Sequence, residues 1–289
     1  MNPQASRVTD ERVSAVEQAL MRSAYVRTVR TERPHHAVEL AREAGEADAL
    51  IVFSGDGGFN EVLNGVERGD LPLGFIPGGG TNVLSRALGL PRDPVEAAER
   101  LAEALARGRT RRISTGRVNG RRFAFSAGIG LDAEAVRRVD ERGRSADGRR
   151  AGDLAFVGAF ARMILERHGR FDPVLEIDGY GRAAFVLVSN VNPYTFLKAL
   201  AIQVAPEAMF EEGLDFLAPV SLTPRTLPPL LFALATGRPA RNALRGHDLD
   251  RIEVRCDRPL PLQADGEDIG DVNEAVFAAE RGSVSILAP

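Results

Sequence analysis

The chain has 289 residues, of which 44% are hydrophobic and 27% are charged, and its formal net charge at pH 7 is −3. This length suits two domains of ordinary size, each with a hydrophobic core of its own. The slightly acidic balance gives no general attraction to nucleic acid, so we expect no nucleic-acid partner. No apolar run approaches the about 20 residues that span a bilayer. Any membrane contact is therefore expected to be peripheral.

The single cysteine, Cys256, cannot form a disulfide within the chain and fits a reducing cytosol. It alternates with Ile252 and Val254, a spacing typical of one face of a strand. We expect a buried thiol with a structural role in a cytoplasmic protein.

The first third of the chain alternates between helical and strand patterns. Apolar residues recur with helical spacing, and short apolar runs between these segments indicate buried strands. Pro94 and Gly108 bound one of the helices. The patterns predict helices over 9–24, 31–44 and 94–107, and strands over 25–29, 49–53 and 73–77.

A glycine-rich turn, Ser54 to Gly58, follows the strand predicted over 49–53. The residues after it predict a helix, because four apolar side chains recur at i, i+3, i+4 and i+7: Phe59, Val62, Leu63 and Val66. The glycines carry no Cβ, so their N–H groups can approach a ligand, and a helix N-terminus adds partial positive charge. Such a turn suits a phosphate group.

A second glycine turn, Gly78 to Asn82, follows the next predicted strand and precedes another helix. Two such turns at the carboxyl ends of parallel strands would share one crevice, where open α/β sheets bind their ligands. Neither turn fits the GxxxxGK[ST] or GxGxxG pattern. The alternative interpretation is that both are only tight strand-to-helix turns.

From Arg111 the pattern changes to short strands and hairpins, with turns at Asn119-Gly120 and Asp178-Gly179. We therefore expect an α/β domain with a parallel sheet over 1–112. We expect a mainly antiparallel β-sandwich to follow over 113–289. A return of its last strand to the sheet of the first domain is left open.

Several later segments have their own predictions. The polar stretch 137–150 is expected to be a loop, with lipid headgroups as an alternative role for its arginines. A helix is expected over 152–167. The segment 223–235 is apolar on more than one side, and we expect it to pack into the core, with an acyl-chain pocket or bilayer contact as the alternative. Strands are expected over 252–256, 260–264, 274–279 and 283–287.

Two motifs carry a resemblance to a known family. Ser54 to Val62, SGDGGFNEV, resembles the GGDGTxNEV nucleotide motif of the diacylglycerol kinase catalytic-domain superfamily, which includes bacterial lipid kinases and sphingosine kinases. Pro77 to Arg86, PGGGTNVLSR, aligns without gaps on that family's PxGTxNDFAR. The resemblance runs nearly end to end and implies an N-terminal domain like that of NAD kinase.

The resemblance implies an ATP-dependent, Mg²⁺-requiring kinase that phosphorylates a hydroxyl of a diacylglycerol-like or sphingoid-like lipid at the inner membrane face. A homodimer is left open. The nucleotide-binding residues that it implies are Thr31, Gly55, Asp56, Gly57, Gly58, Asn60, Glu61, Gly79, Gly80, Thr81 and Asn82.

Phosphoryl transfer also needs a group that accepts the proton of the attacking hydroxyl. Asp265-Gly266-Glu267 resembles the family's DGE turn, which implies Glu267 as general base, with Asp265 orienting it or holding metal. Asp56 is the alternative base, as in related sphingosine kinases. Glu212 matches an acid that binds Mg²⁺ in some bacterial members, although a solvated turn explains the same residue.

The chain departs from the family pattern at several positions. Val83 and Ser114 stand where the family has aspartates of a structural Mg²⁺ network, so that network cannot be intact. The motif threonine is displaced to Thr81, with Gly80 at its aligned position. Residues 2–6 resemble the family's NPxAG turn, and we expect the buried strand before that turn to be missing.

Two other functions are weighed against a lipid kinase. An NAD kinase shares a GGDG motif, but the Asn60-Glu61-Val62 match and the DGE turn favour the lipid kinase. The departures at Val83 and Ser114 would suit a catalytically silent binder of nucleotide or lipid. The presence of both Asp56 and Glu267 argues against that binder.

Overall fold

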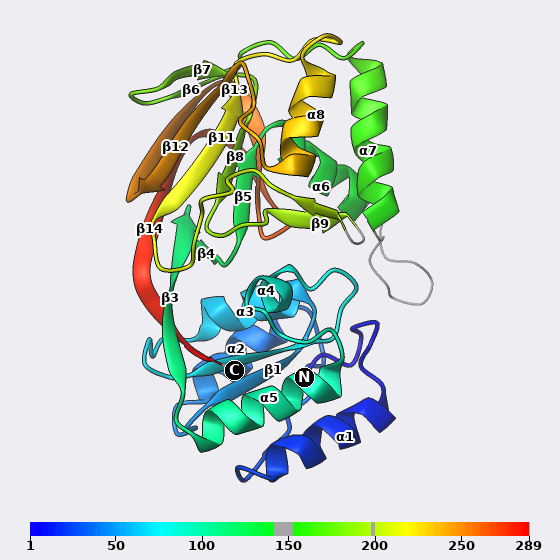
Figure 1. The fold of residues 1–289 in the computed structure, drawn as a ribbon, viewed down its shortest axis with the longest axis vertical. Helices are drawn as coiled ribbons and strands as arrows, with labels where there is room; N and C mark the ends of the chain where they lie inside the picture. Colours follow the sequence, from blue (N-terminus) through cyan, green and yellow to red (C-terminus); the bar gives the residue numbers. More distant parts are fainter. Residues whose placement is uncertain (142–152, 198–199, 289) are drawn as a thin grey trace. The chain divides into compact units, whose positions relative to one another are not determined.

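The computed structural model describes residues 1–141, 153–197 and 200–288 (Figure 1). The chain divides into two compact units. Unit 1 comprises Met1–Ser114 together with Gly282–Pro289, and unit 2 comprises Thr115–Arg281. Each unit is described by itself below.

Unit 1 is an α/β domain with a parallel sheet. Strand β1 (Leu50–Ser54) pairs with β2 (Leu73–Pro77) in parallel, and the end of β14 (Glu267–Leu287) joins β2 in parallel through Ile286 and Leu73. Helix α3 packs on β1, and α5 packs on β2. The helices of unit 1 are α1 (Asp10–Met21), α2 (His36–Glu43), α3 (Asp56–Gly65), α4 (Val83–Ala87) and α5 (Pro94–Ala106).

Local sequence explains where these helices begin. Thr9 caps α1, since its hydroxyl accepts the Arg12 N–H at 3.3 Å. The Asp93 carboxylate accepts the N–H groups of Val95 and Glu96 at 2.9 and 3.1 Å, with Pro94 in the first turn of α5. The predicted strands 49–53 and 73–77 and the helices after both glycine turns are confirmed.

The strand predicted over 25–29 is wrong. Among the described residues, this segment has no ladder partner: the α-amino group of Met1 donates to the Val29 carbonyl at 2.6 Å, and the Thr31 N–H donates to the Met1 carbonyl at 2.9 Å. Two such bonds do not make a strand, and Tyr25 is 94% exposed. Asn2 also donates its N–H to the Phe53 carbonyl at 3.0 Å.

Unit 2 is built mainly from antiparallel strands, so the predicted fold class is confirmed. The strands run in the order β13-β5-β8-β11-β12, with β6–β7 and β3–β4 attached as hairpins. Asn119 and Gly120 both have positive φ, 48° and 81°, as a type I′ hairpin turn requires. The strands are β3 (Thr110–Val118), β4 (Arg121–Phe123), β5 (Ser126–Ile129), β6 (Leu175–Ile177), β7 (Gly181–Ala183), β8 (Val186–Ser189), β9 (Thr195–Leu197), β10 (Leu200–Ile202), β11 (Leu214–Pro219), β12 (Ala243–Leu249) and β13 (Arg251–Ala264).

Two hydrophobic clusters fill unit 2. One lies among the strands and includes Phe123, Phe216 and Phe277. The other packs helices α6 (Leu131–Glu141), α7 (Asp153–Glu166) and α8 (Leu227–Thr236) against the sheet, with Met163 and Leu230 among its members. Cys256 is half-buried against the first cluster, and burial raises its thiol pKa to about 11. The thiol is therefore unreactive at neutral pH.

Helix α6 is a helix that the sequence patterns missed. Residues 137–141, predicted as loop, form its last turns, because Leu131, Ala135 and Val139 are buried one turn apart. Arg137 makes ion pairs with Asp268 and Asp271 at 2.8 and 2.7 Å, which holds its charge on the protein surface. The rest of the predicted loop, 142–150, lies outside the described residues.

Candidate active site

The two glycine turns of unit 1 pack backbone against backbone. The Gly78 N–H donates to the Ser54 carbonyl at 2.7 Å. A Cβ built on Gly79 would lie 2.8 Å from the Cα of Gly55, so any side chain there would push the turns apart. Gly57 and Gly80 are exposed and face open space. The joined turns therefore present accessible backbone at these two glycines.

Asp56 links the first turn to the second. Its two carboxylate oxygens accept the backbone N–H groups of Val83 and Leu84 at 2.9 and 3.1 Å, at the start of α4. Asn82 closes on the second turn, since its side chain accepts the Gly79 N–H at 2.8 Å and donates to the Gly79 carbonyl at 2.7 Å. Asn82 itself has a φ of 50°. Both side chains thus shape the two turns.

Three other predicted nucleotide residues have contacts elsewhere in unit 1. The Glu61 carboxylate accepts the N–H groups of His35 and Ala37, each at 3.3 Å, and so caps α2. Asn60 is buried and accepts a hydrogen bond from Asn64 at 3.1 Å. The Thr31 N–H donates to Met1, whereas Thr81 is half-buried beside the exposed Gly80. The predicted set thus divides into the turns themselves and residues that support nearby helices.

The DGE turn lies in unit 2, between β13 and β14. Asp265 and Gly266 have φ values of 48° and 77°, and Ala264 pairs with Glu267 across the turn. The Asp265 carboxylate is buried and accepts three backbone N–H groups, from Ala124, Phe125 and Ser126, at 2.6, 3.0 and 3.1 Å. A carboxylate used in this way anchors the turn to the β4–β5 connection.

Glu267 differs from Asp265 in both exposure and partner. Its side chain is 38% exposed and forms an ion pair with Arg121, at the start of β4. The guanidinium holds the Glu267 carboxylate in one direction while leaving part of it open to a substrate. Arg121 carried no motif in the sequence, because its partner is 146 residues away.

A buried polar network stands behind the DGE turn. The Gln263 side chain accepts the Gly266 N–H at 2.8 Å and donates to Asp132 and Tyr194 at 2.6 and 2.9 Å. The Tyr194 hydroxyl also donates to Asp132, at 2.6 Å. Burial raises the pKa of both Asp132 and Tyr194. Only the position of Gln263 next to the DGE residues could have pointed to this network from the sequence.

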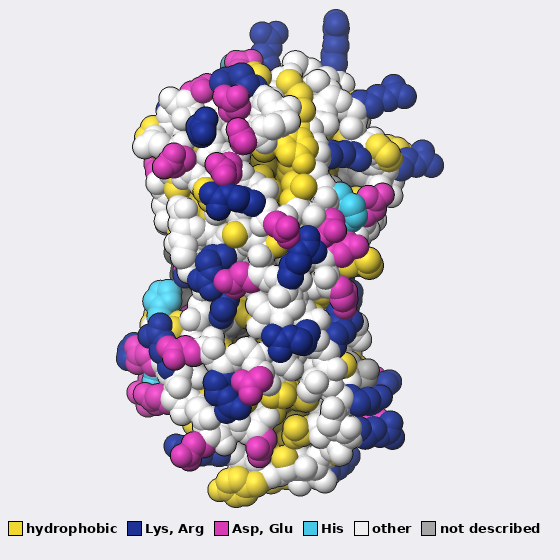
Figure 2. Space-filling model, turned by 90° about the vertical axis from the view of Figure 1, so that its left-hand side faces the viewer, with side chains coloured by type: hydrophobic (Ala, Val, Ile, Leu, Met, Phe, Trp, Pro, Cys, Tyr) yellow, Lys and Arg dark blue, Asp and Glu magenta, His cyan; other side chains and the backbone are white. Residues whose placement is uncertain are grey.

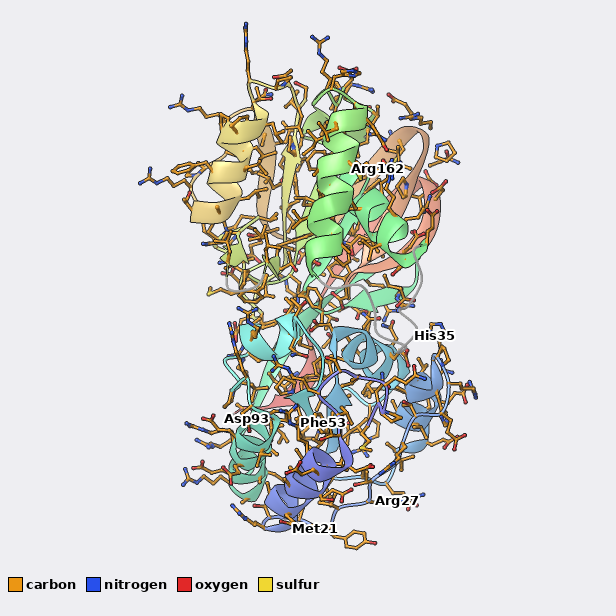
Figure 3. All side chains as sticks on the ribbon, turned by 90° about the vertical axis from the view of Figure 1, so that its right-hand side faces the viewer. Met21, Arg27, His35, Phe53, Asp93 and Arg162 are labelled. Carbon is orange, nitrogen blue, oxygen red and sulfur yellow. The ribbon has the colours of Figure 1, made fainter. Side chains whose placement is uncertain are left out.

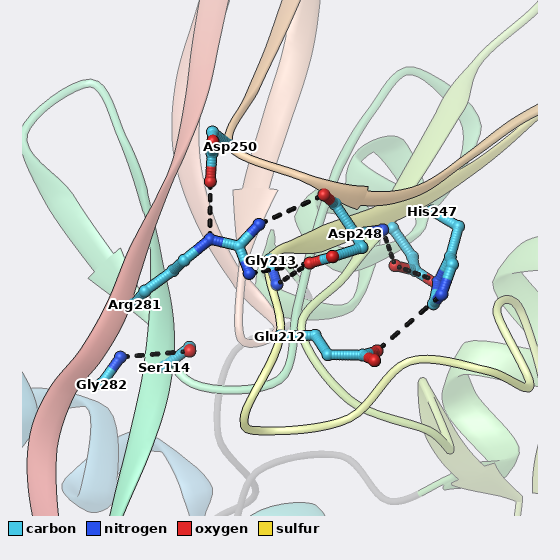
Figure 4. Close-up of polar contacts among 9 residues, drawn as sticks. Ser114, Glu212, Gly213, His247, Asp248, Asp250, Arg281 and Gly282 are labelled. Carbon is cyan, nitrogen blue, oxygen red and sulfur yellow. Dashed lines mark hydrogen bonds and ion pairs between the residues drawn. The ribbon is translucent and has the colours of Figure 1, made fainter.

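Glu212 lies in a separate polar cluster of unit 2, shown in Figure 4. Its Oε2 is buried with no hydrogen-bond partner among the described residues and lies 3.9 Å from Nε2 of His247. The other ring nitrogen of His247 lies 2.9 Å from the buried Asp215 carboxylate, and that hydrogen bond raises the pKa of His247. Arg281 pairs with Asp248 and Asp250 at 2.7 and 2.6 Å beside them.

The fit of these residues to Mg²⁺ differs between the two units. In unit 1, Val83 is buried and has no oxygen to offer a metal, and the buried Ser114 hydroxyl accepts the Gly282 N–H at 3.2 Å. The Asp56 carboxylate accepts backbone N–H groups. A structural metal therefore does not fit these three residues. In unit 2 the buried Glu212 Oε2, which lies 3.9 Å from His247 in an ion pair, could act as a single carboxylate ligand for an ion that keeps several waters. In the described part of the chain, no group of three or more His, Cys, Asp or Glu could hold a metal ion.

Comparison with known proteins agrees with this architecture. The family model of the diacylglycerol kinase catalytic domain matches residues 1–118. A diacylglycerol kinase of Bacillus subtilis is 30% identical over 248 residues, which cover 80% of this chain and 75% of that protein. An uncharacterised Synechocystis protein is 28% identical over 255 residues, or 85% of this chain, and the chain spans 56% of its length. A relative from Streptococcus pneumoniae is 35% identical over 197 residues, and this match covers 61% of that protein's length.

Solved structures share the fold. A diacylglycerol kinase structure from Bacillus anthracis has a TM-score of 0.73 at 18% identity, covering 100% of this chain and 94% of that one. An NAD kinase from Archaeoglobus fulgidus, solved in complex with ATP, has a TM-score of 0.52 at 15% identity, covering 96% and 90%. With the family model and the Bacillus subtilis relative in agreement, the chain belongs to the diacylglycerol kinase catalytic-domain family.

Proposed function

We propose that this chain is an ATP-dependent kinase that transfers the γ-phosphoryl group to a hydroxyl of a diacylglycerol-like or sphingoid-like lipid. The observation that carries the proposal is the joining of the two glycine turns through the Gly55–Gly79 contact and the Asp56 carboxylate. Family membership and this preorganised backbone support a nucleotide rather than some other ligand. Both observations concern the nucleotide and not the choice of lipid.

The turns are suited to the phosphates of ATP. Gly57 and Gly80 are exposed, and no described residue lies within 4 Å of a Cβ built on either, so a phosphate can approach their backbone closely. In this proposal Asp56 serves the site indirectly, by holding both turns in register. Asp56 is therefore not our choice of base, because backbone N–H groups already engage both of its oxygens.

Glu267 is the general base of the proposal. The lipid hydroxyl oxygen attacks the γ-phosphorus, the bond from that phosphorus to the β–γ bridging oxygen breaks, and ADP leaves. The hydroxyl proton passes to the Glu267 carboxylate, which Arg121 orients. Asp265 takes no proton here, since its three N–H donors fix it as the anchor of the turn.

Mg²⁺ bound with ATP would neutralise the charge of the phosphates. Glu212 is the side chain of this chain that we assign to a cation, on the ground of its buried Oε2, which has no hydrogen-bond partner among the described residues. We assign no cation to Val83 and Ser114, where the family's second site would lie.

The test compares Glu267→Gln with Glu274→Gln, a matched change at an exposed position of the same strand. Glu267→Gln should lower phosphate transfer to lipid by about 10²–10⁴-fold, the usual contribution of a general base, with ATP binding retained. Glu274→Gln should keep both phosphate transfer to lipid and ATP binding. Unchanged turnover in Glu267→Gln would refute the base assignment.

A catalytically silent binder is the second candidate, and the lost metal positions Val83 and Ser114 favour it. Such a protein would bind ATP without transferring phosphate to any acceptor. Transfer of phosphate from ATP to an acceptor by the unaltered chain would exclude the silent binder.

A further inference from the structure

Helix α8 is apolar on its exposed side as well as on its buried side. None of its residues, LPPLLFALAT, is charged. Leu230 and Ala233 are buried, whereas Leu231 and Phe232 are 53% and 55% exposed. A helix on a protein surface normally presents polar residues to water. The exposed side of α8 therefore offers apolar surface to a partner.

The chain around α8 is basic. From Phe216 to His247 it carries arginines and no Asp or Glu, although the whole chain has a net charge of −3. Arg225 precedes the helix, and Arg238, Arg241 and Arg245 follow it, all exposed. Arg238 lies over the Phe232 ring, 5.7 Å from its centre. In the described part of the chain, no ion pair involves any of these arginines.

The neighbouring helix α7 provides a contrast. Its Arg162, labelled in Figure 3, pairs with Glu166 at 2.8 Å, and Arg167, just after the helix, pairs with Glu134 at 2.6 Å. These positive charges are neutralised on the protein. The side of unit 2 that carries α8 instead bears dark blue side chains that project into solvent (Figure 2, upper right).

We propose that this α8 face, made of Leu231, Phe232 and the arginines at 225, 238, 241 and 245, docks on a bilayer containing anionic lipid. The apolar side chains enter the interface, and the guanidinium groups bind headgroup phosphates. The inference rests on the proposed function, because a kinase that phosphorylates a lipid must meet that lipid in its bilayer.

Charge favours a bilayer over a second copy of the chain. In a two-fold dimer the same patch meets itself, so the arginines of both copies would face each other with no acid among them. Like charges at an interface disfavour association. An anionic bilayer supplies the opposite charge, and attraction of this kind weakens as salt rises.

The test is vesicle flotation of the full chain with phosphatidylcholine alone and with phosphatidylcholine plus phosphatidylglycerol. Binding should require the anionic lipid and fall with added NaCl. Leu231→Ser with Phe232→Ser should weaken it about tenfold or more, and Arg238→Gln or Arg241→Gln about fivefold each. Leu165→Ser, at a 76% exposed position of α7, and Arg162→Gln are the matched controls and should bind like the unaltered chain.

Two results would overturn the proposal: α8 variants that bind as tightly as the controls, or a dimer in light scattering that Leu231→Ser with Phe232→Ser dissociates. An assay with a short-chain lipid dispersed in detergent separates this inference from the proposed function. The α8 variants should keep full turnover there. If the unaltered chain shows no turnover in that assay, the proposed kinase function is refuted. The flotation experiment then still decides whether the α8 face binds anionic bilayers.

Discussion

At the scale of single residues, the two acids of the DGE turn have different tasks. Asp265 is buried under three backbone N–H donors, while Glu267 is half-exposed beside Arg121. Asp265→Ala leaves three buried donors without an acceptor and should destabilise the protein by about 3 kcal/mol. Glu267→Ala should leave stability nearly unchanged. Urea unfolding of both variants checks this, and equal stability of Asp265→Ala and the unaltered chain would refute the anchoring role.

His247 gives unit 2 a pH-dependent contact. Its hydrogen bond to Asp215 raises its pKa above the ordinary value of 6.5. The protonated ring is therefore favoured in the folded state, so the contact contributes fully below pH 6.5 and is lost as pH rises through the raised pKa. His247→Gln should lower unfolding free energy more at about pH 5.5 than at about pH 9. If the difference in unfolding free energy between His247→Gln and the unaltered chain does not vary with pH, this account is contradicted.

The sequence motifs found these acids but not their partners. Glu267 and Asp265 were singled out by the resemblance of residues 265–267 to the family's DGE turn, and without that resemblance they would read as an ordinary Asp-Gly turn. Arg121 and the backbone donors of Asp265 lie 139 to 146 residues away in the chain. Gln263, Asp132 and Tyr194 meet only through the pairing of β13 with β5 and β5 with β8. Local patterns carry no information on such register.

At the scale of elements, the contact of the two glycine turns is the feature on which the proposed nucleotide binding depends. Gly79→Ala puts a Cβ 2.8 Å from the Gly55 Cα and should separate the turns, lowering ATP affinity about tenfold or more, the equivalent of ~1.4 kcal/mol. Gly45→Ala adds a Cβ in open space at an exposed position outside both turns and is the matched control. Titration calorimetry with ATP measures both. Equal affinities for the two variants would show that the contact is not needed.

Elements with strong local signals were predicted, and those fixed by tertiary contact were not. Pro94 with Asp93, and Asn119 with Gly120, specify a helix start and a hairpin without help from the rest of the chain. Segment 25–29 is apolar enough for a strand but has no ladder partner among the residues that the structure describes. Helix α6 escaped prediction because its last residues begin a polar stretch that looks like a solvated loop until the acidic partners of Arg137 and Arg138 are seen.

At the scale of the whole molecule, the change from βα alternation to hairpins predicted an α/β part followed by an antiparallel part. The structure has this order, and the residues from Gly282 belong to unit 1, where Ile286 pairs with β2. In the described residues, no helix is long and apolar enough to cross a membrane. Separately, our proposal for the α8 face has the lipid acceptor reached from the surface of a bilayer.

The central claim is that this chain moves phosphate from ATP to a lipid. The most direct test supplies the full chain with radiolabelled ATP, Mg²⁺ and separate vesicle preparations of diacylglycerol, monoacylglycerol, sphingosine and phosphatidylinositol, with NAD in a parallel reaction. We predict label in a lipid with a free hydroxyl, and its loss in Glu267→Gln. Label in NAD, or no label in any acceptor despite tight ATP binding, would contradict the account.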